Sequence, residues 1–513
     1  MHKKRSPAVT TNFTLSRYEV SAHFIIRGMI NTSLRTQYPP EGVFTCDDTH
    51  YDPNKPRIKN ILWENYDWLV EMDRTGKARK CVLDNVQRTL LCNTMYLGYD
   101  GFECPNCGNP MIFCRKCHSR FCTSCGIKFQ KILAVKAETM CVDTPHRHIV
   151  FTIPENYRIF FRKDRSALNL LFIAARNTIC KLTNEKIYRR EKKKRGKTGK
   201  IRNDKDNYYL YRNHKDAMVF GMIASIHTFG RDLKWNPHIH ALVPELIYDP
   251  RKDVIKHFHH FDFKNLRHTW QYELNRLMLD HFGRSFRKIV NTSYDIQNNG
   301  FYVYAKYQEE DPSEEGQKKK KDYSKDVAGC VNYMMRYASR PPMAESRILS
   351  HSRKDKTVRW YYEDHKTEER IEVEESSLEL LKKMIIHIPD EGFRTVRYYG
   401  FYNNKKTRQL HRIYELLGME RKNSRDLRQR KEQHLRKMGK LRFRTAVCDS
   451  FNRDVLRCKC GSILEYVDTY NPLEGKTNDR AYRQSCIDEM HEMWVHRKRA
   501  NGRPHLTQRN RAN

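Results

Sequence analysis

Six cysteines between Cys104 and Cys125 constrain the fold of this chain more than any other feature of its sequence. They form three C-x2-C pairs, Cys104/Cys107, Cys114/Cys117 and Cys122/Cys125. Two thiolates at this spacing can hold one edge of a tetrahedral zinc ion at about 2.3 Å, and the Gly, Asn and Pro between them suit the turns of zinc knuckles. The segment therefore predicts a structural zinc ribbon, in preference to a set of free core cysteines.

The number of zinc ions in this ribbon stays open. Two pairs close one four-cysteine site, and the third pair is then either spare or part of a second site that also uses Cys92, Cys81 or His118. A later pair, Cys458 and Cys460, is separated by one residue only, which is a poorer knuckle and disfavours a second ribbon there. Because thiolates fill every position of such a site, we expect the ribbon to serve architecture or DNA docking and not catalysis.

The charge balance indicates a polyanionic partner. Lysine and arginine total 97 against 61 acidic residues, a net charge of +36 that is too large for one solvated helix face. The basic N-terminus has no apolar core behind it, so a secretory signal is not expected. No apolar run nears the ~18 residues that span a bilayer, and the most apolar stretch, residues 167–175, is interpreted as a buried helix face. These observations favour a nucleic-acid partner over a membrane and metal binding over disulfides.

A His-x-His pair stands in the stretch WNPHIHALVPE. Side chains two apart on a strand point to the same face, about 7 Å apart, so His238 and His240 could share one metal ion. The preceding β-rich run ends at Thr228, and the polar link between the two runs predicts a hairpin. If the register allows it, His227 lies beside this pair as a third ligand. A rival pair, His146 and His148, begins an earlier strand-like run.

Two tyrosines occur at helical spacing in the segment DVAGCVNYMMRYASRPPMAESRI. Tyr333 and Tyr337 are four residues apart and would lie on one face of a helix that Pro341 and Pro342 bring to an end. Such a pair is usually core packing. The same segment also contains three arginines that suit phosphate binding better than a dry core, and we expect them to contact DNA: Arg336, Arg340 and Arg347.

Five segments in this order resemble the rolling-circle transposases of bacterial insertion sequences, the IS-ninety-one-like family of two-tyrosine type: KCHSRFCTSCG, HRHIVFTIP, HTFGRDLKWNPHIHALV, NYMMRYASRPPMAESRI and HIPDEGFRTVRYYGFYNN. The resemblance spans roughly residues 92–404. It implies that His238-Ile239-His240 is the HUH metal motif and that Tyr333 and Tyr337 are the catalytic tyrosines. The rival pair then aligns with a strand outside the metal motif. The tight C-terminal cysteine pair and the basic loops near residues 190 and 318 depart from the family pattern, and nothing is carried over there.

The resemblance also implies a chemistry and its partners. The enzyme would nick and rejoin single-stranded or hairpin DNA at the ends of a mobile element, and join it to target DNA, through a 5′-phosphotyrosine intermediate. A phenol with a pKa near ~10 needs a cation at the scissile phosphate. Imidazoles do not select Mg²⁺ by affinity, so Mg²⁺ or Mn²⁺ is expected by family analogy, beside structural Zn²⁺. A bacterial cytoplasmic, nucleoid-associated location follows.

For architecture, the expectation is an α+β fold in which an antiparallel, ferredoxin/RRM-like sheet has the HUH histidines on a central strand and the tyrosine helix across them. The expected domains are an N-terminal helical or DNA-contact region (1–80), a zinc ribbon (81–135), the HUH catalytic domain (140–350), the C-terminal part of the transposase core (351–420) and a basic helical region (421–513).

Three alternatives remain open at this level. A plasmid replication initiator or relaxase would share the HUH chemistry. A zinc-dependent nucleic-acid-binding protein without catalysis would need the charge and the cysteines only, and would tolerate alanine at His238, His240, Tyr333 and Tyr337. The third alternative is an inactive relic of a transposase.

Overall fold

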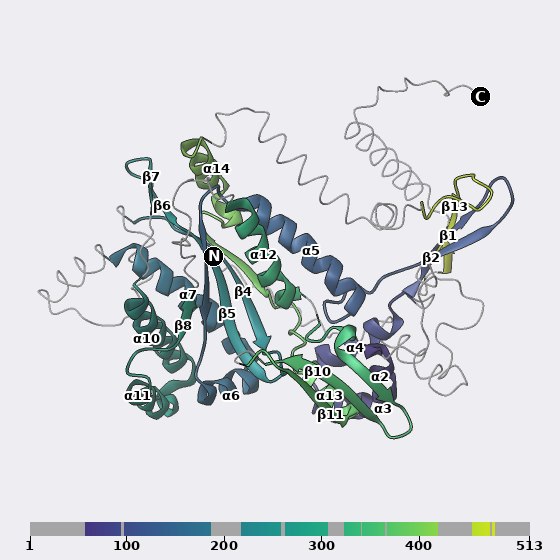
Figure 1. Ribbon diagram of the computed structural model, residues 1–513, viewed down its shortest axis with the longest axis horizontal. Helices are drawn as coiled ribbons and strands as arrows, with labels where there is room; N and C mark the ends of the chain where they lie inside the picture. Colours follow the sequence, from purple (N-terminus) through teal and green to yellow (C-terminus); the bar gives the residue numbers. More distant parts are fainter. Residues whose placement is uncertain are drawn as a thin grey trace, which may run out of the picture. The chain divides into compact units, whose positions relative to one another are not determined.

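The structure is a computed structural model (Figure 1) that describes nine stretches of the chain: residues 57–93, 97–185, 217–257, 262–305, 323–339, 341–364, 367–418, 454–471 and 475–477. The basic loop at 191–205, the charged loop at 311–321, Arg340 and most of the basic C-terminal region lie outside the described residues. The chain divides into two compact units. Unit 1 comprises Met1–Cys125, Ser350–Thr357 and Arg442–Asn513, and unit 2 comprises Gly126–Leu349 and Val358–Leu441.

Unit 1 begins, in its described part, with three short helices, α2 (Ile58–Glu64), α3 (Tyr66–Arg74) and α4 (Lys80–Leu91). Apolar residues recur along them at helical spacing, and those that face the core are buried, including Ile61, Leu69 and Val86. A buried hydrogen bond from Nε2 of Gln87 to the hydroxyl of Tyr66, at 2.9 Å, fixes α4 against α3.

The sheet of unit 1 joins two distant parts of the sequence. Its strand order is β14-β13-β1-β2, with β1 (Tyr99–Glu103), β2 (Pro110–Cys114), β13 (Glu465–Asn471) and β14 (Gly475–Thr477). β1 pairs antiparallel with β2 and with β13, so that Glu103 lies opposite Glu465. Figure 1 shows yellow β13 beside the much earlier β1.

Unit 2 is built on a five-stranded antiparallel sheet of order β12-β4-β5-β3-β8. The strands are β3 (His146–Phe151), β4 (Gly221–Phe229), β5 (Trp235–Pro244), β8 (Val303–Ala305) and β12 (Val396–Gly400). Helices separate β3 from β4 and β5 from β8, and β5 lies between β3 and β4 in space, which is the ferredoxin-like split β-α-β arrangement. The α+β prediction is therefore confirmed, and the strand with His238 and His240 is central.

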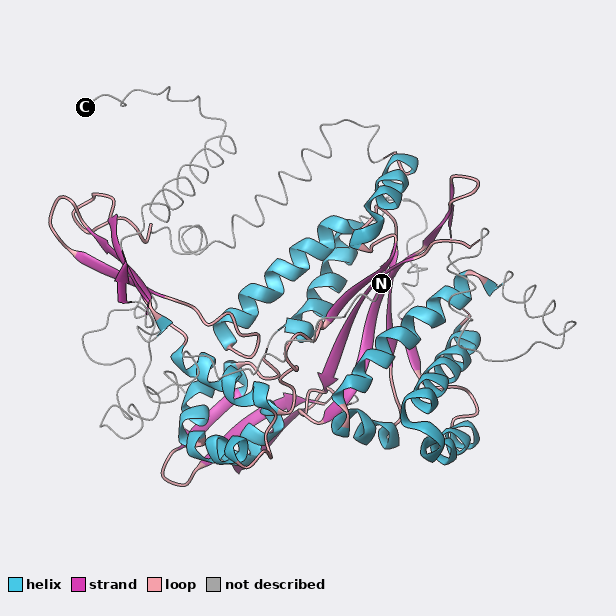
Figure 2. Cartoon of the chain, turned by 180° about the vertical axis from the view of Figure 1, so that it is seen from behind, coloured by secondary structure: helices cyan, strands magenta, loops and turns pink. Residues whose placement is uncertain are grey.

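Helices cover both faces of this sheet (Figure 2). One face packs on α6 (Glu155–Lys163), α7 (Leu168–Thr183), α10 (Phe263–Phe282) and α11 (Arg287–Ile296) through a core that contains Phe151, Ile239 and Trp270. The other face packs on α5 (Thr123–Met140), α12 (Tyr323–Ser339) and α14 (Thr407–Leu416) through Leu242 and Met334. The apolar stretch at 167–175 lies in α7 and is a core helix, as predicted. Within the described parts of the chain, no helix is long and apolar enough to cross a membrane.

The remaining strands form small sheets. β6 (Leu246–Asp249) pairs with β7 (Val254–His257), and a second sheet contains β9 (Ile348–Ser352), β10 (Thr357–Glu363) and β11 (Arg370–Ser376). β11 leads directly into α13 (Ser377–Ile385), which Ser376 caps by accepting from the backbone N–H of Glu379. Neighbouring strands β10 and β11 are thus followed directly by a helix. Single 3-10 turns lie at Arg165–Ala167, Gly283–Phe286, Glu345–Arg347 and Asn404–Lys406.

Gly400 allows β12 to end against β4, and its replacement tests this packing. Its φ is +61°, and a Cβ atom there would lie 1.5 Å from the carbonyl oxygen of Phe220. Gly400→Ala is expected to lower the free energy of unfolding by roughly 3 kcal/mol, because backbone must move. Gly392→Ala is the matched control: φ is +70°, the site has open space, and the expected loss is about 1 kcal/mol. Equal losses in urea titrations would contradict the packing argument.

Candidate functional site

Three histidines meet on one face of the central sheet because of the register between β4 and β5. His227 lies directly opposite His238, and Ser225 lies opposite His240. Residues opposite each other in an antiparallel pair share a face, so all three imidazoles point to the side covered by α12. One ring nitrogen of each histidine lies within 4.8 Å of the others. The hairpin thus places His227 where the sequence anticipated a third ligand.

The turn of this hairpin sets the register. The backbone N–H of Leu233 donates to the carbonyl of Gly230 at 3.2 Å, and Leu233 takes a positive φ of 62°. The pairing shifts between His227 and Phe229, which is a local bulge at the end of β4. A shift of one residue would turn the histidines of β5 to the opposite face, so this turn is part of the site.

Hydrogen bonds to carbonyls fix the ring tautomers of two histidines. Nδ1 of His238 lies 2.7 Å from the carbonyl oxygen of Asn236, and Nε2 of His227 lies 3.1 Å from that of Met334 on α12. A carbonyl only accepts, so these two nitrogens carry the protons. In the neutral rings, Nε2 of His238 and Nδ1 of His227 then hold lone pairs that can bind a cation.

His240 is oriented by a fourth histidine that the sequence reasoning set aside. Nε2 of His148, on β3, lies 2.8 Å from Nδ1 of His240, because the register places Val150 opposite His240. The other ring nitrogen of His240, Nε2, is buried and makes no hydrogen bond within the described residues. A buried polar atom without a hydrogen-bond partner lowers the stability of the fold. An atom of this kind is expected where a ligand binds. His146 takes no part and bonds to the hydroxyl of Tyr402 at 2.7 Å instead.

The electrostatics keep this cluster neutral. Burial lowers the pKa of His227 and of His240 well below the usual imidazole value, and the neighbouring imidazoles lower both further. Burial, followed by the proximity of His238, lowers the pKa of His148 to about 4. At neutral pH these rings are therefore uncharged, which is the state that binds a metal ion.

α12 carries Tyr333 onto this cluster. Its ring centroid lies 5.8 Å from that of His240 and 5.8 Å from that of His148, and its side chain is 39% exposed. Tyr337 lies four residues further along α12, which confirms the predicted helix, and its side chain is outside the description. The hydrogen bond between His227 and the Met334 carbonyl docks this helix beside the histidines.

The three arginines predicted to contact DNA have different positions. Arg336 is exposed on α12. Arg340 lies outside the described residues. Arg347 donates to the carbonyl of Tyr361 at 2.9 Å and to that of Arg231 at 2.5 Å, and its guanidinium lies over the ring of Trp360. These contacts favour a structural role for Arg347, which holds β10 in place.

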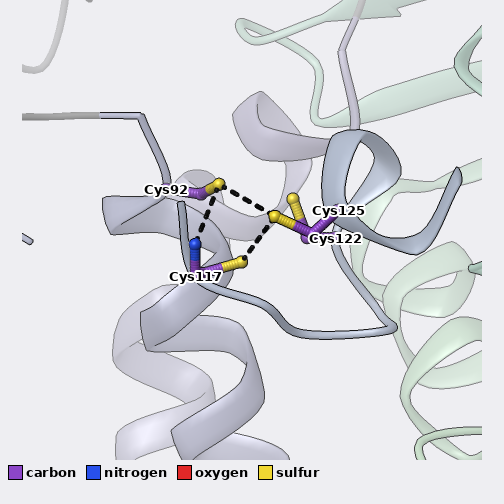
Figure 3. Close-up of side chains that lie close together, drawn as sticks. All are labelled: Cys92, Cys117, Cys122 and Cys125. Atoms are coloured by element: carbon purple, nitrogen blue, oxygen red, sulfur yellow. Dashed lines mark hydrogen bonds between the residues drawn. The ribbon is translucent and has the colours of Figure 1, made fainter. Parts of the chain in front are cut away.

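Among the described residues of unit 1, eight cysteines form two groups of four rather than one ribbon with a spare pair. The first group is Cys92, Cys117, Cys122 and Cys125, all buried (Figure 3). Sγ of Cys125 lies 3.6 Å from that of Cys92 and 3.7 Å from that of Cys117. Cys92 follows the last residue of α4 and Cys125 lies in the first turn of α5, so this group ties the two helices together.

Hydrogen bonds among the thiols of the first group lower the pKa of Cys92, Cys122 and Cys125 and raise that of Cys117. A hydrogen bond from Cys117, followed by one from Cys122, lowers the pKa of the Cys92 thiol to about 7. Nζ of Lys59 donates to the Cys92 carbonyl at 2.7 Å. Burial lowers the pKa of Lys59, while Cys92, Cys122 and Cys117 raise it. Four thiolates around one zinc ion leave a net negative charge, and this ammonium group offsets part of it.

The second group is Cys104, Cys107, Cys458 and Cys460. The one-residue spacing disfavoured a zinc knuckle at Cys458 and Cys460, but pairing between β1 and β13 brings both cysteines to the Cys104 turn. The pairing of Cys114 with Cys117 is wrong: Cys117 joins Cys92, and Cys114, at the end of β2, belongs to neither group. Three further residues were candidates for a second zinc site. Cys92 lies in the first group, whereas Cys81 and His118 lie in neither group.

Comparisons with known proteins agree with this arrangement. Residues 63–153 match the family described as "Transposase zinc-binding domain", and residues 221–409 match the family described as "Putative transposase". The second match contains the three histidines and both tyrosines, and the first contains the first cysteine group and His148.

Two relatives match most of the chain. It is 27% identical over 404 residues to the "Transposase for insertion sequence element IS801" of Pseudomonas savastanoi pv. phaseolicola, covering 75% of this chain and 85% of that protein. It is 24% identical over 356 residues to "Putative transposase y4qJ" of Sinorhizobium fredii (strain NBRC 101917 / NGR234), covering 67% and 81%. No solved structure matches the chain.

Together, the fold, the cysteine groups and the two matched domains define a transposase with an N-terminal zinc-binding domain. Within this class, the two matched domains are those of IS91-type insertion-sequence transposases, and the IS801 transposase is similar to the chain over most of its length.

Proposed function

We propose that this transposase nicks and rejoins single-stranded DNA at the ends of its insertion sequence through a 5′-phosphotyrosine intermediate, in rolling-circle transposition. The observation that carries the proposal is the position of Tyr333. Its partly exposed ring lies beside a cluster of three histidines that each place one ring nitrogen within 4.8 Å of the others, and α12 is docked on that cluster through Met334. A nucleophile next to a cation site, on a helix open to solvent on one side, suits attack on a DNA backbone.

The histidine cluster fits a divalent cation. His227, His238 and His240 would hold it. Among their ring nitrogens, Nε2 of His240 is the buried atom without a hydrogen bond in the described structure, and a bound cation would satisfy it. Three neutral imidazoles favour borderline ions over hard ones, so Mn²⁺ fits this donor set better than Mg²⁺. When bound, such an ion would supply positive charge at the scissile phosphate.

The residues of the chain account for the covalent step. The phenolic oxygen of Tyr333 forms a bond to phosphorus as the bond from phosphorus to the 3′-oxygen breaks. The departing 3′-oxygen takes up a proton, and the phenol loses one, so the products are a 5′-phosphotyrosine and a free 3′-hydroxyl. The phosphodiester energy is kept in the new ester, and a 3′-hydroxyl can reverse the step without ATP. Tyr337 would hold a second strand end in succession.

A single-stranded or hairpin substrate suits the site better than an intact duplex. Tyr333 must approach the backbone of one strand, and Arg336, exposed on the same helix, offers a phosphate contact. The net charge of +36 supplies the nonspecific attraction that depends on salt.

The test is a denaturing gel of the purified chain with Mn²⁺ and labelled single strands from the DNA that flanks its gene. A covalent adduct is expected with the wild-type chain and is expected to disappear in Tyr333→Phe. Tyr304→Phe, which changes an exposed tyrosine on β8, is the matched control and should keep the adduct. An adduct that survives Tyr333→Phe and Tyr337→Phe together would overturn the proposal.

His148 should act as a positioning residue for the cation site. His148→Ala is expected to weaken the apparent Mn²⁺ affinity in cleavage by roughly 10- to 100-fold, because His240 loses the hydrogen bond that orients its ring. His148→Gln, which keeps a hydrogen-bonding group, should recover part of this loss. The control is His146→Ala, on the same strand but bonded to Tyr402: it should lower stability and leave the Mn²⁺ dependence unchanged. Identical metal curves for all variants would refute the role.

A further inference from the structure

The second cysteine group has the dimensions of a metal site. Sγ of Cys104 lies 3.4 Å from Sγ of Cys460, and Sγ of Cys107 lies 3.5 Å from Sγ of Cys458. All four sulfur atoms are within 4.8 Å of one another. Sulfur atoms that surround zinc at ~2.3 Å in a tetrahedron are about 3.8 Å apart, whereas a disulfide needs about 2.05 Å. The four atoms are therefore spaced for a shared ion and not for two disulfides.

The two halves of the group are built in the same way, although their cysteine spacing differs. In the first turn, the backbone N–H of Gly108 donates to the carbonyl of Cys104, and Gly108 has a φ of +67°. In the second turn, the N–H of Gly461 donates to the carbonyl of Cys458, and Gly461 has a φ of +95°. A glycine in the left-handed region directly after the second cysteine lets each chain turn back, so both thiols point to one centre.

Strand pairing brings these turns together. Cys104 follows the last residue of β1, and the C-terminal turn ends at Leu464, just before β13 begins. Because Glu103 lies opposite Glu465, both turns project from the same end of the sheet. Buried Cys104, Cys458 and Leu464 pack with Phe102 and Met111, which closes the inner side, whereas Cys107 and Cys460 are exposed.

We propose that Cys104, Cys107, Cys458 and Cys460 bind a second structural zinc ion, so that the zinc-binding domain is completed by a segment near the C-terminus. The matched zinc-binding family ends at residue 153 and supplies only half of this site. The two halves are separated by more than 350 positions, since Cys107 and Cys458 are 351 residues apart. The ion would close a long loop of chain whose sequence contains all of unit 2.

The proposal predicts two zinc ions per chain in the full-length protein purified with a phosphine reductant. Elemental analysis should give about two zinc ions for the wild type and about one for the Cys458→Ser/Cys460→Ser double variant. Cys460→His, which keeps a ligand of a type that zinc accepts, should retain about two. One zinc ion in the wild type that is unchanged in the double variant would overturn the proposal.

A second measurement does not depend on variant folding. Cys107 and Cys460 are exposed, so as free thiols they should react at once with iodoacetamide. Mass spectrometry of the wild-type chain should show both protected when zinc is bound and both alkylated after chelation with EDTA, while half-buried Cys330 changes little. Immediate alkylation of Cys107 and Cys460 in the zinc-loaded chain would refute the site, as would a mass that shows disulfides under reducing conditions.

Discussion

His240→Ala should abolish metal-dependent strand cleavage, with a loss of at least roughly 10³-fold in rate, or about 4 kcal/mol at ~1.4 kcal/mol per tenfold. The expectation rests on the buried Nε2 of His240, which has no hydrogen-bond partner in the described structure, and on its place between His227 and His148. Its removal takes away the central imidazole of the cluster. The measurement is a single-turnover cleavage assay across a Mn²⁺ titration.

The fold should survive this change, which makes the assay interpretable. Removing the unpaired Nε2 of His240 also removes a desolvation penalty, which offsets part of the cost of the lost hydrogen bond to His148 and of the cavity. His240→Ala should therefore still unfold cooperatively, with a modest loss of stability. His257→Ala, on the small β6-β7 hairpin, is the control that should cleave normally. If His240→Ala cleaves at the wild-type rate and with the same Mn²⁺ dependence, the histidine cluster is not the cation site.

Cys122→Ser is expected to remove the zinc ion of the first cysteine group and to unfold the helices around it. Zinc contributes ~10–16 kcal/mol of apparent binding free energy to the folding of zinc fingers, and loss of one ligand from a buried four-cysteine site should cost roughly 5 kcal/mol of that. α4 and the first turn of α5 then lose the link through Cys92 and Cys125, whose Sγ atoms lie 3.6 Å apart. Far-UV circular dichroism, thermal unfolding and zinc content measure the effect.

Cys114→Ser is a sharp control for this variant. Cys114 is also buried and also belongs to a C-x2-C pair, yet it lies in neither four-cysteine group. We expect this variant to keep its zinc and to lose no more than about 1 kcal/mol of stability. Zinc loss in Cys114→Ser with zinc retained in Cys122→Ser would show that the ligands are assigned wrongly.

Local patterns in the sequence were sufficient to predict the hairpin and the helix that form the candidate site of unit 2. Alternating residues and a polar turn predicted the hairpin that carries His227 and His238, and the four-residue spacing of Tyr333 and Tyr337 predicted α12. These patterns work because side-chain periodicity is set by the geometry of a single strand or helix. The family resemblance then supplied the central position of the histidine strand, which the sheet order confirms.

The two groups of four cysteines could not be predicted from local sequence patterns in the same way. A C-x2-C pair shows only that two thiolates share one edge of a tetrahedron, and it does not show which other edge completes the site. Cys117 lies in a group with Cys92 and not with Cys114, and Cys107 lies beside Cys458. Helix packing and the pairing of β1 with β13 determine which thiols lie close together. His148 was likewise missed, since its contact with His240 depends on the register between β3 and β5.

The sequence by itself determined the kinds of elements, the candidate ligand residues, the basic charge and the family that the chain resembles. Periodicity and composition are local properties, so they can be determined from the sequence without knowledge of the fold. Only the tertiary structure decided which four cysteines share a centre, that a C-terminal strand completes the zinc-binding sheet, and that His148 orients His240. Each of these depends on contacts between residues far apart in the chain, and such contacts are fixed by strand register and packing rather than by spacing along the sequence.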